Sequence, residues 1–190
     1  MVRRWHARPR GAVRGGWRQK GDTQEPAEHA LGRSRGGFST KIHVVCDRHG
    51  HPLGVRLSPG QTHESQELEA LLEGIDCEDH DGEPLAYPAR LAGDKAYRAD
   101  WIDDWLLENE IEPVIPSKAN EDRDARPVEF DREAYRERNI VERLIGWLKE
   151  SRRVLTRFEK TAVNFLAMVK WACLKRYLRL MTQSGFSDRA

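Results

Sequence analysis

The chain has 190 residues, a length that suits one domain with a sizeable core plus an arm or tail. Charged residues make up 33% of the chain, but the formal net charge is only +1, so the overall balance favours no particular partner. No apolar run approaches the roughly 20 residues of a membrane span, which argues against a membrane protein. The three scattered cysteines form no CxxC pair, which argues against a zinc site or a disulfide framework. We therefore expect a cytoplasmic protein with reduced thiols and no membrane partner.

Residues 1–37 are rich in Gly, Arg and Pro and show no sustained periodicity, so we expect a basic arm or loop there. Up to residue 40, nine Lys and Arg residues face three acidic residues. Such an arm could contact a polyanion, or it could be a solvated, disordered terminus. The charge pattern leaves both possibilities open.

A segment rich in β-branched residues, 39–47, and an alternating segment, 53–59, flank a turn signal and predict a β-hairpin. Leucines at helical spacing then predict a helix over residues 63–75. The acidic stretch at residues 76–89 reads as a loop. After it, a short apolar run predicts a buried strand that ends on Asp94.

The second half of the chain alternates helical and extended patterns. Residues 99–111 predict an amphipathic helix followed by a short strand, and residues 117–131 read as an exposed loop. Two further helices are expected at about 131–150 and 161–182. This order indicates an α/β or α+β fold, with a mixed sheet flanked by helices. The aromatic and aliphatic residues of these segments that we expect in the protein core are Trp101, Trp105, Leu106, Ile111, Phe165, Leu166, Val169, Trp171 and Leu174.

Four polar residues share one stripe of the predicted helix 131–150. An α-helix turns about 100° per residue, so with Arg138 at zero, Lys149 falls near 20°, Glu142 near 40° and Tyr135 near 60°. Val141, Leu144, Ile145 and Leu148 occupy the adjacent apolar sector. This geometry suits the edge of a cleft, but it suits equally a solvated face with an Arg138–Glu142 pair.

Asp94 follows the predicted strand at residues 89–94, at the edge where α/β sheets usually carry their chemistry. A carboxylate there, together with one on a helix, could hold Mg²⁺, a cation that prefers oxygen ligands. The alternative is that Asp94 caps the helical turn that follows. The sequence pattern alone does not choose between them.

Taken together, these motifs resemble the DDE transposases of bacterial insertion sequences. Residues 135–149 match the family signature Y-x2-R-x3-E-x6-K at every position, and GDKAY around Asp94 looks like the family's second aspartate motif. The segments GRSRGGFSTKIH, PLGVRLSPGQTHES and EPVIPSKAN also look like family blocks, so the resemblance covers roughly residues 30–180. It implies an RNase H-like fold, in which three carboxylates bind two divalent metal ions, Mg²⁺ or Mn²⁺.

The resemblance also implies roles for individual residues. Asp94 and Glu142 would be the second and third metal-binding, catalytic carboxylates. Arg138 and Lys149 would contact DNA near the scissile phosphate, supported by Tyr135. The chemistry would be nicking at the transposon end and attack of the freed 3′-hydroxyl on target DNA. Four further basic residues would extend the phosphate contacts: Arg152, Arg153, Arg157 and Lys160.

The chain departs from the family pattern at the first aspartate, since no D-S-T-like motif precedes the GRSRGG block. Asp22 lies in a loop sequence, and Asp47 ends what resembles the family's second strand. We therefore expect an RNase H-like domain over residues 38–182 that lacks its first strand, with a tail at 183–190. On this interpretation the isolated chain would be inactive, as the downstream frame of a frameshifted transposase or as a decayed remnant.

Two functions follow from these patterns. The first is a transposase catalytic domain that acts on transposon ends and target DNA. The second is a non-catalytic DNA-binding fragment that modulates an intact transposase. A homo-oligomer or an upstream-frame product is a further expected partner, and the expected location is the bacterial nucleoid.

Overall fold

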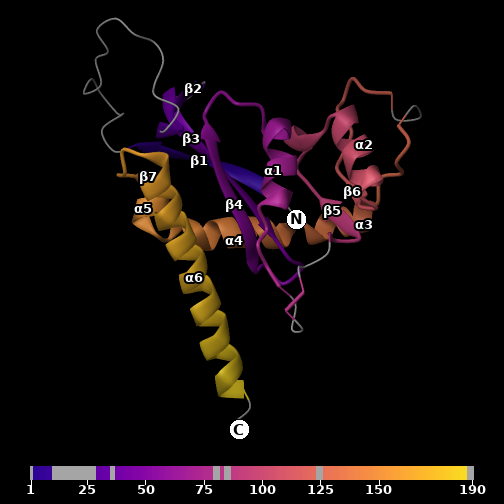
Figure 1. The fold of residues 1–190 in the computed structure, drawn as a ribbon. Coiled ribbons are helices and arrows are strands. Elements are labelled where there is room, and N and C mark those ends of the chain that lie inside the picture. Colours follow the sequence, from indigo (N-terminus) through magenta and orange to yellow (C-terminus); the bar gives the residue numbers. More distant parts are fainter. Residues whose placement is uncertain are drawn as a thin grey trace, which may run out of the picture. The chain divides into compact units, whose positions relative to one another are not determined.

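The computed structural model describes residues 2–9, 29–34, 37–78, 82–83, 87–122 and 126–187 (Figure 1). The strands are β1 (Val2–Pro9), β2 (Gly32–Ser34), β3 (Gly37–Cys46), β4 (Pro52–Pro59), β5 (Arg90–Ala92), β6 (Glu112–Val114) and β7 (Thr156–Arg157). The α-helices are α1 (Leu68–Glu73), α2 (Asp100–Glu108), α3 (Arg132–Glu137), α4 (Asn139–Lys149), α5 (Arg152–Leu155) and α6 (Ala162–Ser187), and the 3₁₀ helices include η2 (Glu64–Glu67) and η3 (Lys95–Tyr97). The fold is mixed α/β, as expected of an RNase H-like domain.

The described strands form two sheets. The five-stranded sheet has the order β2-β3-β1-β7, and β4 pairs with β3. β2 is antiparallel to β3, whereas β1 and β7 are parallel. The second sheet consists of β5 and β6, paired in parallel. The predicted hairpin is therefore confirmed as β3 and β4.

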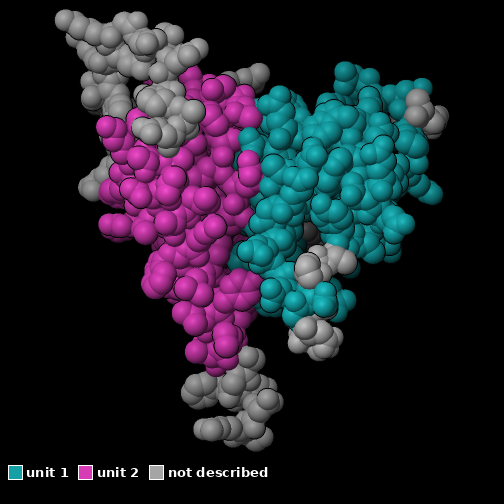
Figure 2. Space-filling model, viewed as in Figure 1, with its two compact units in different colours: residues 1–4, 43–54, 63–143 teal, residues 5–42, 55–62, 144–190 magenta. Residues whose placement is uncertain are grey.

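The chain divides into two compact units, coloured teal and magenta in Figure 2. Unit 1 comprises residues 1–4, 43–54 and 63–143, and unit 2 comprises residues 5–42, 55–62 and 144–190. β5, β6 and α2 lie in unit 1, whereas β7 and α6 lie in unit 2.

Unit 1 has an apolar core in which side chains from α1, α2 and η3 meet those of β3 and β5. Burying these residues removes most of their surface from water, which stabilises the unit by about 25 cal/mol per Å² of apolar area. The two short helices supply leucine and isoleucine at helical spacing, which explains why both fold against the same core. The buried members are Val45, Leu68, Leu71, Leu72, Leu91, Tyr97, Ile102, Leu106, Ile111 and Ile115.

Asp47 builds the turn of the hairpin. Its Oδ1 accepts hydrogen bonds from the backbone amides of His49 and His51, each at 2.8 Å, and its Oδ2 lies 2.7 Å from Nδ1 of His51. Burial would raise the pKa of Asp47, but these hydrogen bonds hold it below its ordinary value. Gly50 has φ +82, which favours glycine in this turn. Asp47 therefore has a structural role here.

The sequence predictions for the arm, the linker after residue 150 and the tail are wrong. Residues 2–9, expected in the arm, form β1, so the sheet has a strand ahead of the hairpin. The linker after residue 150 contains α5 and β7, and α6 runs to Ser187, into the expected tail. β7 pairs with the end of β1, at Arg8 and Pro9, and β1 also neighbours β3 in the sheet. These partners lie far away in the sequence, so local periodicity does not predict either strand. Residues 10–28 of the predicted arm lie outside the described residues.

The predicted core is confirmed for Leu106, Ile111, Phe165 and Val169, which are buried, and Trp105 packs partly against the core of unit 1. Leu166 is only partly buried. The prediction is wrong for three large side chains that lie exposed on helices: Trp101, Trp171 and Leu174. Helical spacing identifies the apolar face of a helix, but a neighbouring element must also cover that face for the residues to be buried.

None of the helices within the described residues combines the length and apolarity that crossing a bilayer requires. The three cysteines are free thiols. Burial raises the pKa of Cys46 to about 11 and that of Cys173 to about 12, so both remain protonated at neutral pH.

Candidate functional site

Asp94 stands where the sequence placed it, directly after β5. The amide of Gly93 donates to the carbonyl of Val114 at 3.2 Å, so the parallel pairing of β5 and β6 continues up to this residue. Asp94 occupies the N-cap position of η3, but its side chain makes no capping hydrogen bond. Asp94 is thus the N-cap residue of η3 by position only, and this half-buried carboxylate lies at the carboxyl end of a strand.

Tyr97 anchors the turn that carries Asp94. Its ring is fully buried, and its hydroxyl lies 2.8 Å from Nδ1 of His43 on β3. The amide of Tyr97 also donates to the carbonyl of Asp94 at 2.8 Å. The strand end and the hairpin are thus tied together through one side chain.

Replacing Tyr97 with Phe should lower the free energy of unfolding by about 1 kcal/mol, because the variant keeps the ring and loses the buried hydrogen bond between the hydroxyl and His43. Urea unfolding followed by circular dichroism measures the change. Tyr87→Phe is the matched control, since the exposed Tyr87 should tolerate the loss of its hydroxyl within about 0.5 kcal/mol. Equal effects of the two substitutions would contradict the anchoring role of Tyr97.

The predicted helix at residues 131–150 is interrupted at Arg138. α3 ends at Glu137, and α4 begins at Asn139. The amide of Val141 donates to the carbonyl of Arg138 at 3.0 Å, an i→i−3 bond typical of a tightened 3₁₀ turn. The prediction of one continuous helix is therefore wrong. The apolar stripe is confirmed, since Val141, Leu144, Ile145 and Leu148 are buried.

Three of the four signature residues are in contact around this turn. Nη2 of Arg138 lies 2.9 Å from Oε1 of Glu142, and its guanidinium carbon lies 4.9 Å from the ring centroid of Tyr135. Nε and Nη1 of Arg138 are buried and have no hydrogen-bond partner among the described residues. The side chain of Glu142 is 40% exposed, so its carboxylate faces solvent while it holds the guanidinium. Tyr135, Arg138 and Glu142 thus form one polar cluster, and its Arg138–Glu142 pair is the contact that the solvated-face alternative named.

The remaining basic candidates lie in unit 2. Lys149 is the exposed last residue of α4, and Arg152 and Arg153 are exposed on α5. The side chain of Arg153 is 67% exposed and lies 3.7 Å from the carboxylate of Glu159. These three side chains are accessible to a phosphate.

The expectation that Arg157 extends the phosphate contacts is wrong, because this side chain is fully buried. Its guanidinium donates to the carbonyls of Glu159 and Lys160, each at 2.8 Å, and to the hydroxyl of Thr40. It also lies over the ring of Phe165, 5.1 Å from its centroid. Arg157 is therefore a structural residue of unit 2.

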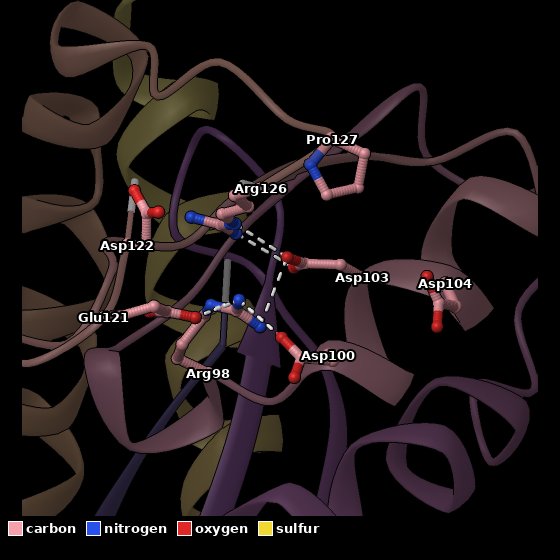
Figure 3. Close-up of a pocket in the computed structure, with 8 residues that line it drawn as sticks. All are labelled: Arg98, Asp100, Asp103, Asp104, Glu121, Asp122, Arg126 and Pro127. Carbon is pink, nitrogen blue, oxygen red and sulfur yellow. Dashed lines mark hydrogen bonds and ion pairs between the residues drawn. The ribbon is translucent and has the colours of Figure 1, made fainter. Parts of the chain in front are cut away.

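A second polar cluster, around α2, was not identified from the sequence (Figure 3). Asp103 is buried and binds Arg126 through Nε at 2.6 Å and Nη2 at 2.9 Å, and Nη1 of Arg98 lies 3.3 Å away. Nη2 of Arg98 lies 2.7 Å from Oδ1 of Asp100, and Arg98 is also paired with Glu121. Burial would lower the pKa of Arg98, but these carboxylates raise it. The sequence signal for this cluster was a charged residue, Asp103, on the apolar side of α2, between the core residues Ile102 and Leu106.

The chemistry of the site fits a divalent cation only in part. Asp94 and Glu142 offer the carboxylate oxygens that Mg²⁺ prefers. Within the described ranges, no group of three or more His, Cys, Asp or Glu side chains is placed to hold a metal ion. Asp47 is engaged in its turn, and Asp22 lies outside the described residues. Of the three implied carboxylates, Asp94 and Glu142 remain the candidates within the described residues.

A mixed α/β fold with an aspartate after a strand and a glutamate on a helix is consistent with an RNase H-like domain. Comparison with known proteins identifies the family within this class. Residues 15–174 match the transposase DDE domain family, and the chain belongs to that family.

Two relatives agree with this assignment. The chain is 30% identical over 142 residues to a protein of Brucella ovis assigned as a transposase for insertion sequence element IS6501. The alignment covers 75% of this chain and all of that relative. It is also 30% identical over 142 residues to a protein of Burkholderia cepacia assigned as a transposase for element IS402. That alignment covers 74% of this chain and 63% of the relative.

Proposed function

We propose that this chain is the catalytic part of an insertion-sequence transposase, which binds transposon ends and target DNA for metal-dependent strand cleavage and transfer. The observation that carries the proposal is the polar cluster of Tyr135, Arg138 and Glu142, within a chain that matches the family over residues 15–174. Asp94 and Glu142 would hold Mg²⁺ or Mn²⁺. When bound, such ions would activate the attacking oxygen and neutralise charge on the phosphate.

The residues of this chain would contribute positioning and charge. Arg138 already neutralises Glu142, so a metal ion and the guanidinium would compete for the same carboxylate until a phosphate accepts the guanidinium. The two donors of Arg138 that lack partners are consistent with a missing acceptor of this kind. Lys149, Arg152 and Arg153 would bind phosphates along the DNA backbone.

We infer that the chain does not cleave DNA by itself, because no third carboxylate joins Asp94 and Glu142 in the proposed site, and no group of three or more potential ligands is placed to hold a metal ion within the described residues. An incomplete set of ligands binds its ions weakly, and phosphoryl transfer depends on their placement. This observation also favours the second candidate, a DNA-binding fragment that modulates an intact transposase. An upstream-frame product could supply the remaining carboxylate.

A nicking assay on duplexes that carry the ends of the element, with Mg²⁺ or Mn²⁺, separates the two candidates. We expect the chain to bind these duplexes without nicking them. Nicking that disappears in both Asp94→Asn and Glu142→Gln would identify the chain as an enzyme by itself and exclude the modulating fragment. Absence of salt-sensitive binding to any DNA would contradict both proposals.

The metal site has a test that needs no activity. Titration with Mn²⁺, followed by electron paramagnetic resonance, should show weak binding that both Asp94→Asn and Glu142→Gln abolish. Asp104→Asn is the control, because Asp104 is an exposed carboxylate of α2 and should leave the titration unchanged. Identical titrations for all variants would remove Asp94 and Glu142 from the proposed site.

Lys149→Ala should weaken binding to any DNA sequence and make the salt dependence shallower. Losing one phosphate contact changes the slope of log K against log salt by about 0.9. Fluorescence anisotropy across a salt series measures the slope. Lys118→Ala is the comparison, since Lys118 is exposed in the loop after β6 and outside the signature. An unchanged slope in Lys149→Ala would exclude the proposed contact.

A further inference from the structure

An apolar stripe on α6 is left uncovered. Trp171 and Met181 are 64% and 68% exposed, and Leu174 and Leu178 between them are exposed as well. Their spacing of three, four and three residues places all four on one helix face, the pattern by which helices pack on one another. A contiguous exposed stripe of this kind marks an interaction surface, unlike a single exposed leucine.

The charges around this stripe indicate the kind of partner. The sequence of α6 contains no Asp or Glu. With Trp171 at zero and about 100° per residue, the stripe spans roughly 280° to 360°, and Lys170 and Lys175 fall just outside its two edges. Both lysines are exposed. Two α6 helices placed together would align rows of like charge, so the favoured partner is an acidic helix face.

The other basic residues of α6 already have roles within unit 2. The guanidinium carbon of Arg176 lies 3.0 Å from the ring centroid of Trp147. Arg179 lies 3.3 Å from the carboxylate of Glu150. Lys170 and Lys175 are therefore the lysines of α6 that flank the stripe and face solvent.

α2 presents an acidic face with exposed apolar residues at its edges. Asp100, Asp104 and Glu108 are exposed and lie within about 80° of one another around the helix. Leu107 and Trp101, which is 45% exposed, border this acidic row on its two sides. One edge of α6, with its lysine, would pack on the acidic row of α2. The apolar stripe of α6 would then meet Leu107 or Trp101 beside that row.

The hollow beside α2 strengthens the negative field on this side of the helix (Figure 3). Its volume is about 410 Å³. Five carboxylates and two guanidinium groups line it, so its formal charge is negative, and Asp100 and Asp104 belong both to the hollow and to the acidic face. Such a field attracts lysine side chains and speeds their association.

We propose that α6 of one copy of this chain docks on the acidic face of α2 of a second copy. The two faces are complementary in charge, and both are exposed in the same chain, so a second copy offers each face the partner that it needs. In the proposed dimer, each copy would contribute α6 to one contact and α2 to the other. This assembly does not depend on whether the chain cleaves DNA.

A charge exchange tests this contact in the full chain. The first variant is Lys170→Glu with Lys175→Glu on α6, and the second is Asp104→Lys with Glu108→Lys on α2. Sedimentation velocity should show dimers of the unaltered chain at about 50 μM and low salt, and monomers for each variant alone. An equimolar mixture of the two variants should form dimers again, because each pair of faces then has opposite charges.

Several outcomes would overturn the proposal. They are a monomeric unaltered chain at this concentration, a dimer that survives either charge exchange, or a mixture of variants that stays monomeric. Unchanged thermal unfolding midpoints confirm that each variant is folded. Trp171→Ala supplies an independent test, because loss of an exposed aromatic anchor should weaken dimerisation at least tenfold without touching a charge.

Discussion

Asp103→Asn is expected to destabilise the chain by about 3–5 kcal/mol, because it removes the shared carboxylate of two buried arginines. The side chains of Asp103, Arg98 and Arg126 are almost completely inaccessible to water. Asparagine keeps the size of the side chain but carries no charge. The two guanidinium groups would then be buried without the negative charge that offsets the cost of removing them from water.

Each arginine keeps other hydrogen-bond or ion-pair partners in the variant, and these limit the loss of stability. Arg126 also donates to the carbonyl of Ile115 at 2.6 Å, and Arg98 keeps Asp100 and Glu121. Chemical denaturation with urea at neutral pH gives the loss of unfolding free energy directly. The matched control is Asp104→Asn at the next position, where the carboxylate is exposed and a change within about 0.5 kcal/mol is expected. Similar losses at both positions would contradict the role of Asp103.

Arg157→Met should cost about 3 kcal/mol or more of unfolding free energy. The guanidinium satisfies the carbonyls of Glu159 and Lys160 and the hydroxyl of Thr40, and methionine would leave these acceptors without their donor. Each buried acceptor that loses its partner costs about 1–3 kcal/mol. Methionine fills a similar volume, so the loss reports mainly on hydrogen bonding rather than on a cavity.

Two comparisons make this second prediction sharp. Arg153→Met removes an exposed arginine nearby in the sequence and should change the unfolding free energy by no more than about 0.5 kcal/mol. Arg157→Lys keeps the charge but not the planar set of donors, so its effect should be close to that of methionine. If Arg157→Lys were as stable as the unaltered chain, charge rather than hydrogen-bond geometry would explain the burial. If Arg157→Met matched Arg153→Met, the structural role of Arg157 would be excluded.

The sequence by itself determined the elements that depend on neighbouring residues. The alternation around residues 38–59 predicted the hairpin of β3 and β4, and the apolar run before Asp94 predicted the strand end. Helical spacing predicted the buried stripe of α4, including Val141 and Leu148. The polar signature predicted the contact of Arg138 with Glu142, because residues four apart on a helix lie side by side.

Only the tertiary structure decided which polar and apolar side chains are covered. Arg153 and Arg157 look alike in the sequence, yet one is exposed and the other fully buried, because Thr40 and two carbonyls surround the second. Trp171 lies about 120° around α6 from the buried Phe165, on a face that no described element covers. Local spacing tells which side chains share a face. The residues that cover such a face, or that neutralise its charges, come from segments far away in the sequence, so only the tertiary structure shows them.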